Sequence, residues 1–154
     1  MAQIRTIAIC LIQDENRIFV LEGFDPVKGD HFYRPLGGGV DFGEQSADAV
    51  VREFQEELGE ALIGVEYLDT LENIFTYKGQ PGHEIVLLYQ GGFSNQALYQ
   101  KEEVWAKEDS GKAFKACWVD IDDLLSGQKR LVPEQLLQRL PHWLKSGRLR
   151  SLSK

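Results

Sequence analysis

Alternating apolar and polar residues are the main pattern of this chain, and they predict a protein built largely of β-strands. Polar or glycine-containing turns separate the alternating stretches, and two pairs of strands lie close enough in sequence to form hairpins. The expected strands are residues 4–13, 17–22, 32–36, 63–77, 84–93 and 115–120. Loops are expected over residues 23–30 and 94–112, and the second is long and polar, as functional or mobile loops are.

One amphipathic helix is expected in the middle of the chain, with Ser46 as its N-cap and Gly59 as its C-terminal stop. Its apolar stripe recurs every three or four residues and consists of Ala47, Val50, Val51, Phe54 and Leu58. Further helices are expected over residues 122–125 and at the C-terminus, with Pro133 in the first turn and a break or bend near Pro141. These elements indicate an α+β fold, a central mixed sheet flanked by helices.

Three glutamates gather on one side of the central helix. Glu53, Glu56 and Glu57 lie about 110° around the helix from the centre of the apolar stripe. Such carboxylates repel one another by about 4 kcal/mol for a pair 4 Å apart at an effective dielectric of 20. A solvated acidic face is the plain alternative, but it explains neither the glycines at 37–39 nor Glu44 before the helix. A glycine-rich segment leading into an acidic helix suits a metal-bound phosphate, with Mg²⁺ or Mn²⁺ as the cation.

The segment from Gly38 to Glu60, GGVDFGEQSADAVVREFQEELGE, resembles the Nudix box G-x5-E-x7-R-E-U-x-E-E-x-G-U, where U is a bulky apolar residue. The chain departs from this pattern at Glu60, where the family usually has an aliphatic residue, and this affects helix-end packing rather than the chemistry. The resemblance implies the Nudix α/β/α sandwich as a single domain over residues 1–154. It also implies a pyrophosphohydrolase that cleaves the diphosphate of a nucleoside diphosphate linked to another moiety.

The resemblance further implies roles for individual residues. The implied ligands of Mg²⁺ or Mn²⁺ are three side chains and one backbone carbonyl, those of Glu53, Glu56, Glu57 and Gly37. Arg52 is implied to orient the box glutamates by salt bridging, and Glu44 to support the metal or the loop. The general base stays open between Glu53, which has that role in some members, and an acidic residue of the long polar loop, Glu102 or Glu103. Either loop glutamate taken singly is better explained as a solvated side chain.

Substrate contacts are expected from the residues around the glycines and from one hairpin. The expected substrate-binding residues are Arg34, Gly38, Gly39 and Tyr77. Tyr77 falls where diadenosine polyphosphate hydrolases of the family have a tyrosine, and Thr76 stands where many ADP-ribose pyrophosphatases have a proline. ADP-ribose-like compounds, dinucleoside polyphosphates and nucleoside triphosphates therefore all stay open as substrates.

The composition of the chain limits the kinds of molecule that it is expected to bind. A net charge of −7 argues against a surface that tracks nucleic-acid phosphates, so a small nucleotide is the expected partner. No apolar run is long enough to span a membrane, and the first residues lack the features of a signal peptide, which favours the cytoplasm. A second copy of the chain, in a homodimer, is a further option. A non-catalytic Nudix-like nucleotide sensor is the alternative function, but sensors tend to lose box carboxylates and this chain keeps them all.

Overall fold

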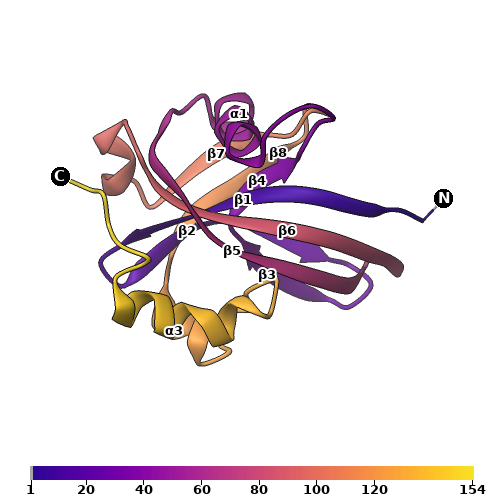
Figure 1. Ribbon diagram of the computed structural model, residues 1–154. Coiled ribbons are helices and arrows are strands. Elements are labelled where there is room, and N and C mark those ends of the chain that lie inside the picture. The colour runs from indigo at the N-terminus through magenta and orange to yellow at the C-terminus, as the bar shows by residue number, and fades with distance from the viewer. Residues whose placement is uncertain (1) are drawn as a thin grey trace.

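The computed structural model describes residues 2–154, which form an eight-stranded mixed sheet with α1 on one face and α3 on the other (Figure 1). The strands are β1 Ile4–Asp14, β2 Arg17–Asp25, β3 Asp30–Arg34, β4 Leu36–Gly39, β5 Leu62–Tyr77, β6 Gln80–Phe93, β7 Glu103–Lys107 and β8 Ala113–Asp120. The helices are α1 Ser46–Leu58, the 3₁₀ helix η1 Gln96–Gln100, α2 Ile121–Leu125 and α3 Leu136–Ser146. The expected α+β fold with a mixed sheet flanked by helices is confirmed.

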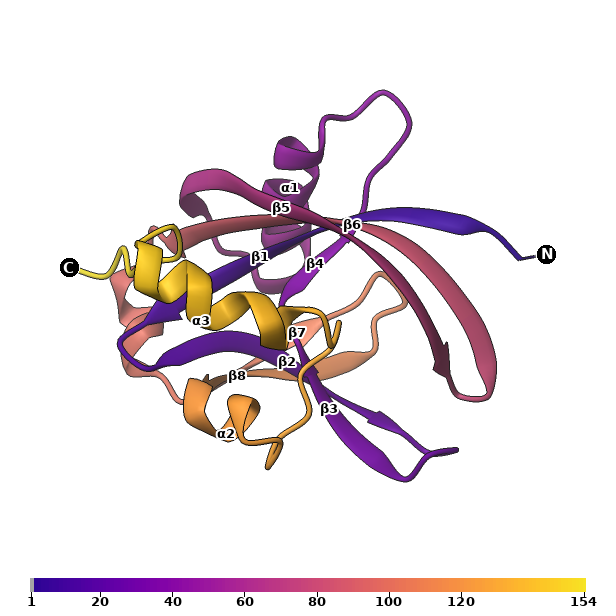
Figure 2. The same ribbon diagram turned by 60° about the horizontal axis from the view of Figure 1, so that its bottom comes forward.

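Strand β1 joins the two halves of the sheet, whose order is β5-β6-β1-β2-β8-β7. One edge of β1 pairs in parallel with β6, and the other pairs antiparallel with β4 and, only at its end, with β2. Away from this short β1–β2 pairing the two halves of the sheet diverge. The β5–β6 and β2–β3 hairpins therefore lie apart along most of their length (Figure 2). Their tips touch again, because Nζ of Lys28 donates to the carbonyl of Thr76 at 2.8 Å and the backbone N–H of Lys78 donates to Asp25 at 3.2 Å.

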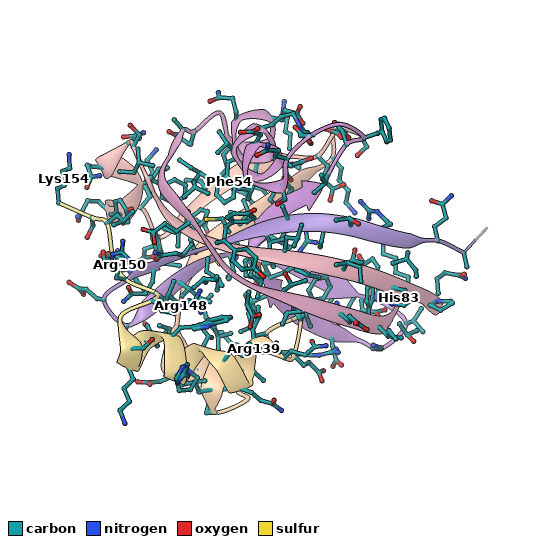
Figure 3. All side chains as sticks on the ribbon, viewed as in Figure 1. Phe54, His83, Arg139, Arg148, Arg150 and Lys154 are labelled. Atoms are coloured by element: carbon teal, nitrogen blue, oxygen red, sulfur yellow. The ribbon has the colours of Figure 1, made fainter. Side chains whose placement is uncertain are left out.

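Alternation along β1 divides the core into two layers, because successive side chains of a strand point to opposite faces. Ile7, Ile9 and Leu11 pack with α3, and the residues between them pack with α1. Phe54 reaches from α1 into the second layer (Figure 3). The chain end closes the fold, since the hydroxyls of Ser151 and Ser153 donate to the carboxylate of Asp14 at 3.0 and 2.8 Å.

The prediction of a long polar loop over residues 94–112 is wrong. Helix η1 and strand β7 occupy most of it, and Leu98, Tyr99 and Ala106 are buried in the core. The expected loop over residues 23–30 is shorter, because β2 runs through Asp25 and β3 begins at Asp30. The strand expected over residues 32–36 is two strands separated by Pro35, which has no N–H to give to a ladder.

The helices differ from expectation in detail. Gln45, not Ser46, is the N-cap of α1, and the Ser46 hydroxyl instead lies 2.6 Å from the hydroxyl of Tyr89. The buried stripe is rotated, so that Ala49 is fully buried and Val51 is 39% exposed. Gly59 ends α1 in the left-handed conformation, as expected.

Helix α3 runs without a break from Leu136 to Ser146, through Pro141, and Pro133 precedes it instead of occupying its first turn. None of the helices in the described part of the chain has the length and apolarity needed to cross a bilayer.

Candidate active site

Two glycines allow β4 to fit tightly between α1 and β1. A Cβ at Gly38 would lie 2.5 Å from Cδ of Glu53, so the absent side chain lets this carboxylate rest against the strand. A Cβ at Gly37 would lie 2.0 Å from the carbonyl oxygen of Ala8 in β1, and the φ of Gly37 is +152°. Only glycine fits at position 37, because the clash there is with backbone, whereas a side chain at position 38 would displace the carboxylate of Glu53. The sequence therefore brings a backbone segment and an acidic helix into direct contact.

Arg52 is the centre of the charged groups in this region. Its Nε and Nη2 donate to both carboxylate oxygens of Glu44, at 2.8 and 2.9 Å. Its Nη1 donates to Glu53 at 3.0 Å and to Glu56 at 3.2 Å. Nη2 also donates to the carbonyl of Gly39 at 3.0 Å. One guanidinium thus ties the loop before α1, the helix and β4 together.

The electrostatics of the site differ from one carboxylate to the next. Hydrogen bonds from Arg52 lower the pKa of Glu44 to about 2, so this carboxylate is charged at neutral pH. Burial and the negative charge of Glu53 raise the pKa of Glu57 to about 8, and the charge of Arg34 acts in the opposite direction. The negative form of Glu57 is therefore disfavoured where it lies, by burial and by the charge of Glu53.

No three Asp, Glu, His or Cys side chains within residues 2–154 converge as a ready set of metal ligands. Arg52 bonds one oxygen of Glu53, Oε1, and one oxygen of Glu56, Oε2. The residues nevertheless fit a hard divalent cation. Glu57 has a raised pKa beside Glu53, and the donors are all oxygen atoms.

The other expected residues divide into two groups. Arg34 ends β3 close enough to Glu57 to affect its pKa, so the structure brings it to the box. Tyr77 lies at the tip of the β5–β6 hairpin, where its ring meets the edge of Phe32 with centroids 5.7 Å apart. The structure does not bring Tyr77 into contact with the box glutamates.

Glu102 and Glu103 also lie apart from the box. The carboxylate of Glu103 is 3.6 Å from Nζ of Lys115, and the backbone carbonyl of Glu102 accepts from the N–H of Trp118 at 3.2 Å. Both glutamates line a groove of about 340 Å³ together with Lys129, and no box residue lines it.

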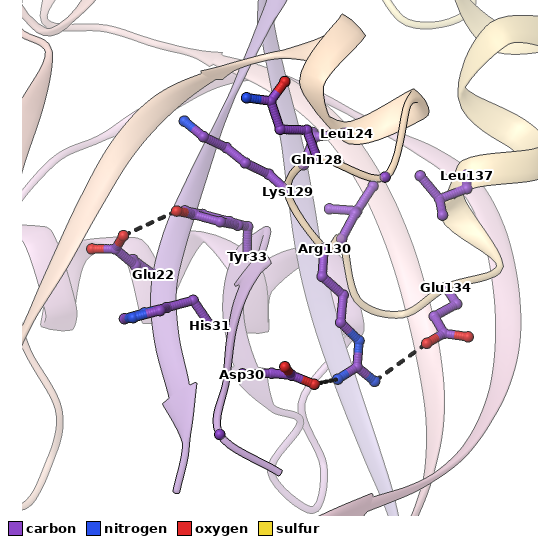
Figure 4. A pocket seen from close by; sticks show the side chains of 13 residues that line it. Glu22, Asp30, His31, Tyr33, Leu124, Gln128, Lys129, Arg130, Glu134 and Leu137 are labelled. Carbon is purple, nitrogen blue, oxygen red and sulfur yellow. Dashed lines mark hydrogen bonds and ion pairs between the residues drawn. The ribbon is translucent and has the colours of Figure 1, made fainter.

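A second groove, of about 760 Å³, lies between β3 and the segment that connects α2 to α3 (Figure 4). Tyr33 donates to Glu22 at 3.0 Å on one side of it, and on the other Arg130 pairs with Asp30 at 3.7 Å and Glu134 at 3.2 Å. The box glutamates do not line this groove. Four of its charged groups, Glu22, Asp30, Arg130 and Glu134, already have ion-pair partners within the protein.

Asp109 is an acidic residue near the box that the sequence interpretation did not include. It lies in the turn between β7 and β8, and its charge helps to raise the pKa of Glu57. The turn is closed by hydrogen bonds from Glu108 N–H to the carbonyl of Lys112 at 2.9 Å and from Gly111 N–H to the carbonyl of Glu108 at 2.8 Å. Its position depends on the pairing of β7 with β8, and nothing local in the sequence signals that pairing.

Replacing Arg52 by lysine is expected to lower kcat/KM by at least about tenfold, the lower end of what losing a supporting hydrogen-bond partner costs at such sites. Lysine keeps the charge but cannot reach both oxygens of Glu44 and the carbonyl of Gly39 at once. Steady-state kinetics at saturating Mg²⁺ would measure the loss, with Arg130→Lys as a matched control on the far groove. Equal activity in both variants would show that charge alone is needed at position 52.

Comparison with known proteins identifies the family to which this chain belongs. The sequence profile of the NUDIX domain matches residues 2–140. The RNA pyrophosphohydrolase of Pelagibacter ubique is 24% identical over 126 residues, covering 77% of either chain. The uncharacterized Nudix hydrolase YvcI of Bacillus subtilis is 25% identical over 124 residues, 80% of this chain and 71% of the relative.

Among solved structures, the MutT NUDIX hydrolase from Burkholderia pseudomallei superposes with a TM-score of 0.62 at 24% identity, covering 88% of this chain and 95% of that one. At this level of identity the superposition supports the fold, whereas the match to the family profile extends over most of the chain. The protein therefore belongs to the Nudix hydrolase family and is a hydrolase that acts on pyrophosphate bonds.

Proposed function

We propose that this protein hydrolyses the diphosphate linkage of a small nucleotide with Mg²⁺ or Mn²⁺ held by Glu53, Glu56, Glu57 and the carbonyl of Gly37. The observation that carries this proposal is that Glu57 is partly buried beside the negative charge of Glu53, because a divalent cation would offset both effects. When bound, such a cation neutralises charge on the diphosphate and lowers the pKa of a bound water.

The protein's own groups have three tasks in this proposal. Arg52, fixed on Glu44, holds Glu53 and Glu56 in place. Arg34, beside Glu57, adds a positive charge where a phosphate would lie. Asp109 would accept the proton of the attacking water, which is supported by the effect of its charge on Glu57 from outside the box.

The nucleoside diphosphate derivative is a finer question. ADP-ribose, dinucleoside polyphosphates and nucleoside triphosphates all present a diphosphate that the site would fit. The name of the relative from Pelagibacter ubique, RNA pyrophosphohydrolase, adds a 5′-triphosphate oligonucleotide to the compounds worth testing.

The decisive experiment incubates the protein with each of these compounds and Mg²⁺ and identifies the released products by chromatography. We expect two phosphate-containing products for at least one compound, and no products when EDTA is present. Tight binding of a nucleotide without products, in Mg²⁺ and in Mn²⁺, would instead support the alternative of a nucleotide sensor.

A further inference from the structure

Three carboxylates are buried in the described part of the chain, and two of them have the partners that burial requires. Asp14 is bound by Arg17, Ser151 and Ser153. Asp25 accepts hydrogen bonds from the backbone N–H groups of residues 27, 28 and 78. Both therefore have a structural explanation within the protein.

Glu84 is the third, and it lacks such partners. It is 8% exposed, yet among residues 2–154 no hydrogen-bond donor reaches its carboxylate. Its contact is with Nη1 of Arg5 at 3.8 Å, and the Arg5 side chain is 62% exposed. Asn73, its cross-strand neighbour on β5, gives it no hydrogen bond. Both carboxylate oxygens still reach the surface, so they are open to a ligand that brings hydrogen-bond donors.

The position of Glu84 connects it to the candidate active site. Arg5 of β1 is paired with Glu84 of β6, and two residues further along β1, Ile7 is paired with Gly39 of β4. Paired residues share a face and side chains alternate, so Arg5, Glu84 and Gly39 lie on the same face of the sheet. That face is the reverse of the one on which Gly38 meets Glu53, and a Cβ at Gly39 would lie 3.4 Å from Nη2 of Arg5.

Gly39 thus contacts two different arginines, Arg52 through its carbonyl and Arg5 on the opposite face of the sheet. Its carbonyl accepts from Arg52 on the side of the glutamates, and its missing side chain leaves room beside Arg5. A nucleotide whose phosphates lie at the box and whose base passes the edge of β4 would meet Arg5 and Glu84 next. Figure 2 shows that the first parts of β1 and β6 extend past the end of α3.

We propose that Arg5 and Glu84 recognise the base of the nucleotide and that the preferred base is guanine, an inference that rests on the proposed function. Guanine presents two adjacent donors, N1–H and the 2-amino group, which match the two oxygens of a carboxylate. Its O6 and N7 acceptors lie next to them and match a guanidinium. Adenine has an acceptor, N1, beside its amino group, and would oppose one carboxylate oxygen.

The test measures binding of GMP and IMP, which differ only in the 2-amino group and carry no pyrophosphate bond. The protein is expected to bind GMP about tenfold more tightly than IMP, because IMP leaves one oxygen of a buried carboxylate without a donor. Glu84→Gln should bring the ratio of the two Kd values close to one. Glu72→Gln, an exposed glutamate on β5 that is paired with Ile85, is the matched control and should keep the tenfold ratio.

A Kd ratio that is the same in the wild type and in Glu84→Gln would overturn the proposal, as would tighter binding of AMP than of GMP. Because these probes need no turnover, the result is separate from the hydrolysis assay. Turnover without base discrimination would refute the guanine inference alone. Discrimination without turnover of any compound would refute the proposed hydrolysis and leave base recognition standing.

Discussion

Glu57→Gln is expected to lower kcat by about 10³-fold, which corresponds to about 4 kcal/mol of lost transition-state stabilisation. The change removes one charge from the proposed metal site while keeping the shape of the side chain. Steady-state kinetics over a range of Mg²⁺ concentrations measure it, with Glu60→Gln just after the helix as control, because Glu60 accepts hydrogen bonds from Asn95 instead of facing the box. A kcat within twofold of the wild type at saturating Mg²⁺ would exclude Glu57 as a ligand.

The same variant has a pH signature without metal. The pKa of Glu57 is raised from an ordinary 4.5 to about 8 in the fold, so the folded protein keeps a proton that the unfolded chain releases. Stability from this group is therefore fully present below pH 4.5 and is lost as the pH rises to about 8. In EDTA, the thermal midpoint of the wild type should fall over this window relative to that of Glu57→Gln. If the thermal midpoints of the two proteins change with pH in parallel, the pKa of Glu57 is not raised in the folded protein.

Asp109→Asn is expected to lower kcat by about 10²-fold, the lower range for the loss of a general base. The double variant Glu102→Gln, Glu103→Gln is the matched control, because both residues lie at the start of β7 and line a groove that no box residue lines. Thermal unfolding should be unchanged in both variants, since exposed turn residues contribute at most about 0.5 kcal/mol to folding.

The opposite pattern, loss in the double variant and normal activity in Asp109→Asn, would assign the base to the start of β7. Normal activity in both would leave Glu53 as the base. A parallel pH–rate profile separates these cases from a purely structural effect, because loss of the base should remove the rise in kcat with pH that deprotonation of the base produces.

Much of the box was predictable because its interactions are local. Glu53, Glu56 and Arg52 lie within one helical turn, so helix geometry alone brings their charges together. The contact of Arg52 with Glu44 needed the motif, since the two residues are joined by a loop. The strand β7 could not be predicted, because its alternation covers five residues and Glu103 and Lys107 at its ends are charged.

Asp109 and Glu84 were out of reach for a different reason. The place of Asp109 depends on which strand β7 pairs with, and the burial of Glu84 depends on its having β1 on one side and β5 on the other. In the sequence, Glu84 is simply the first residue of the expected strand 84–93. Long-range pairing of this kind leaves no periodic signal in the residues themselves, whereas burial of a carboxylate becomes visible once the strands are placed.

The end of the chain bears on how the protein should be produced. The segment shared with the family stops at residue 140, inside α3, but Trp143 and Leu149 are buried beyond it and Leu152 lies against the bare backbone of Gly64 and Gly92. Truncating the protein at residue 140 would therefore expose the apolar residues of β5 and β6 that Trp143 and Leu149 cover. An affinity tag is better attached before β1, whose first residue Ile4 is exposed, than after Lys154, whose N–H is already bound to Gln96.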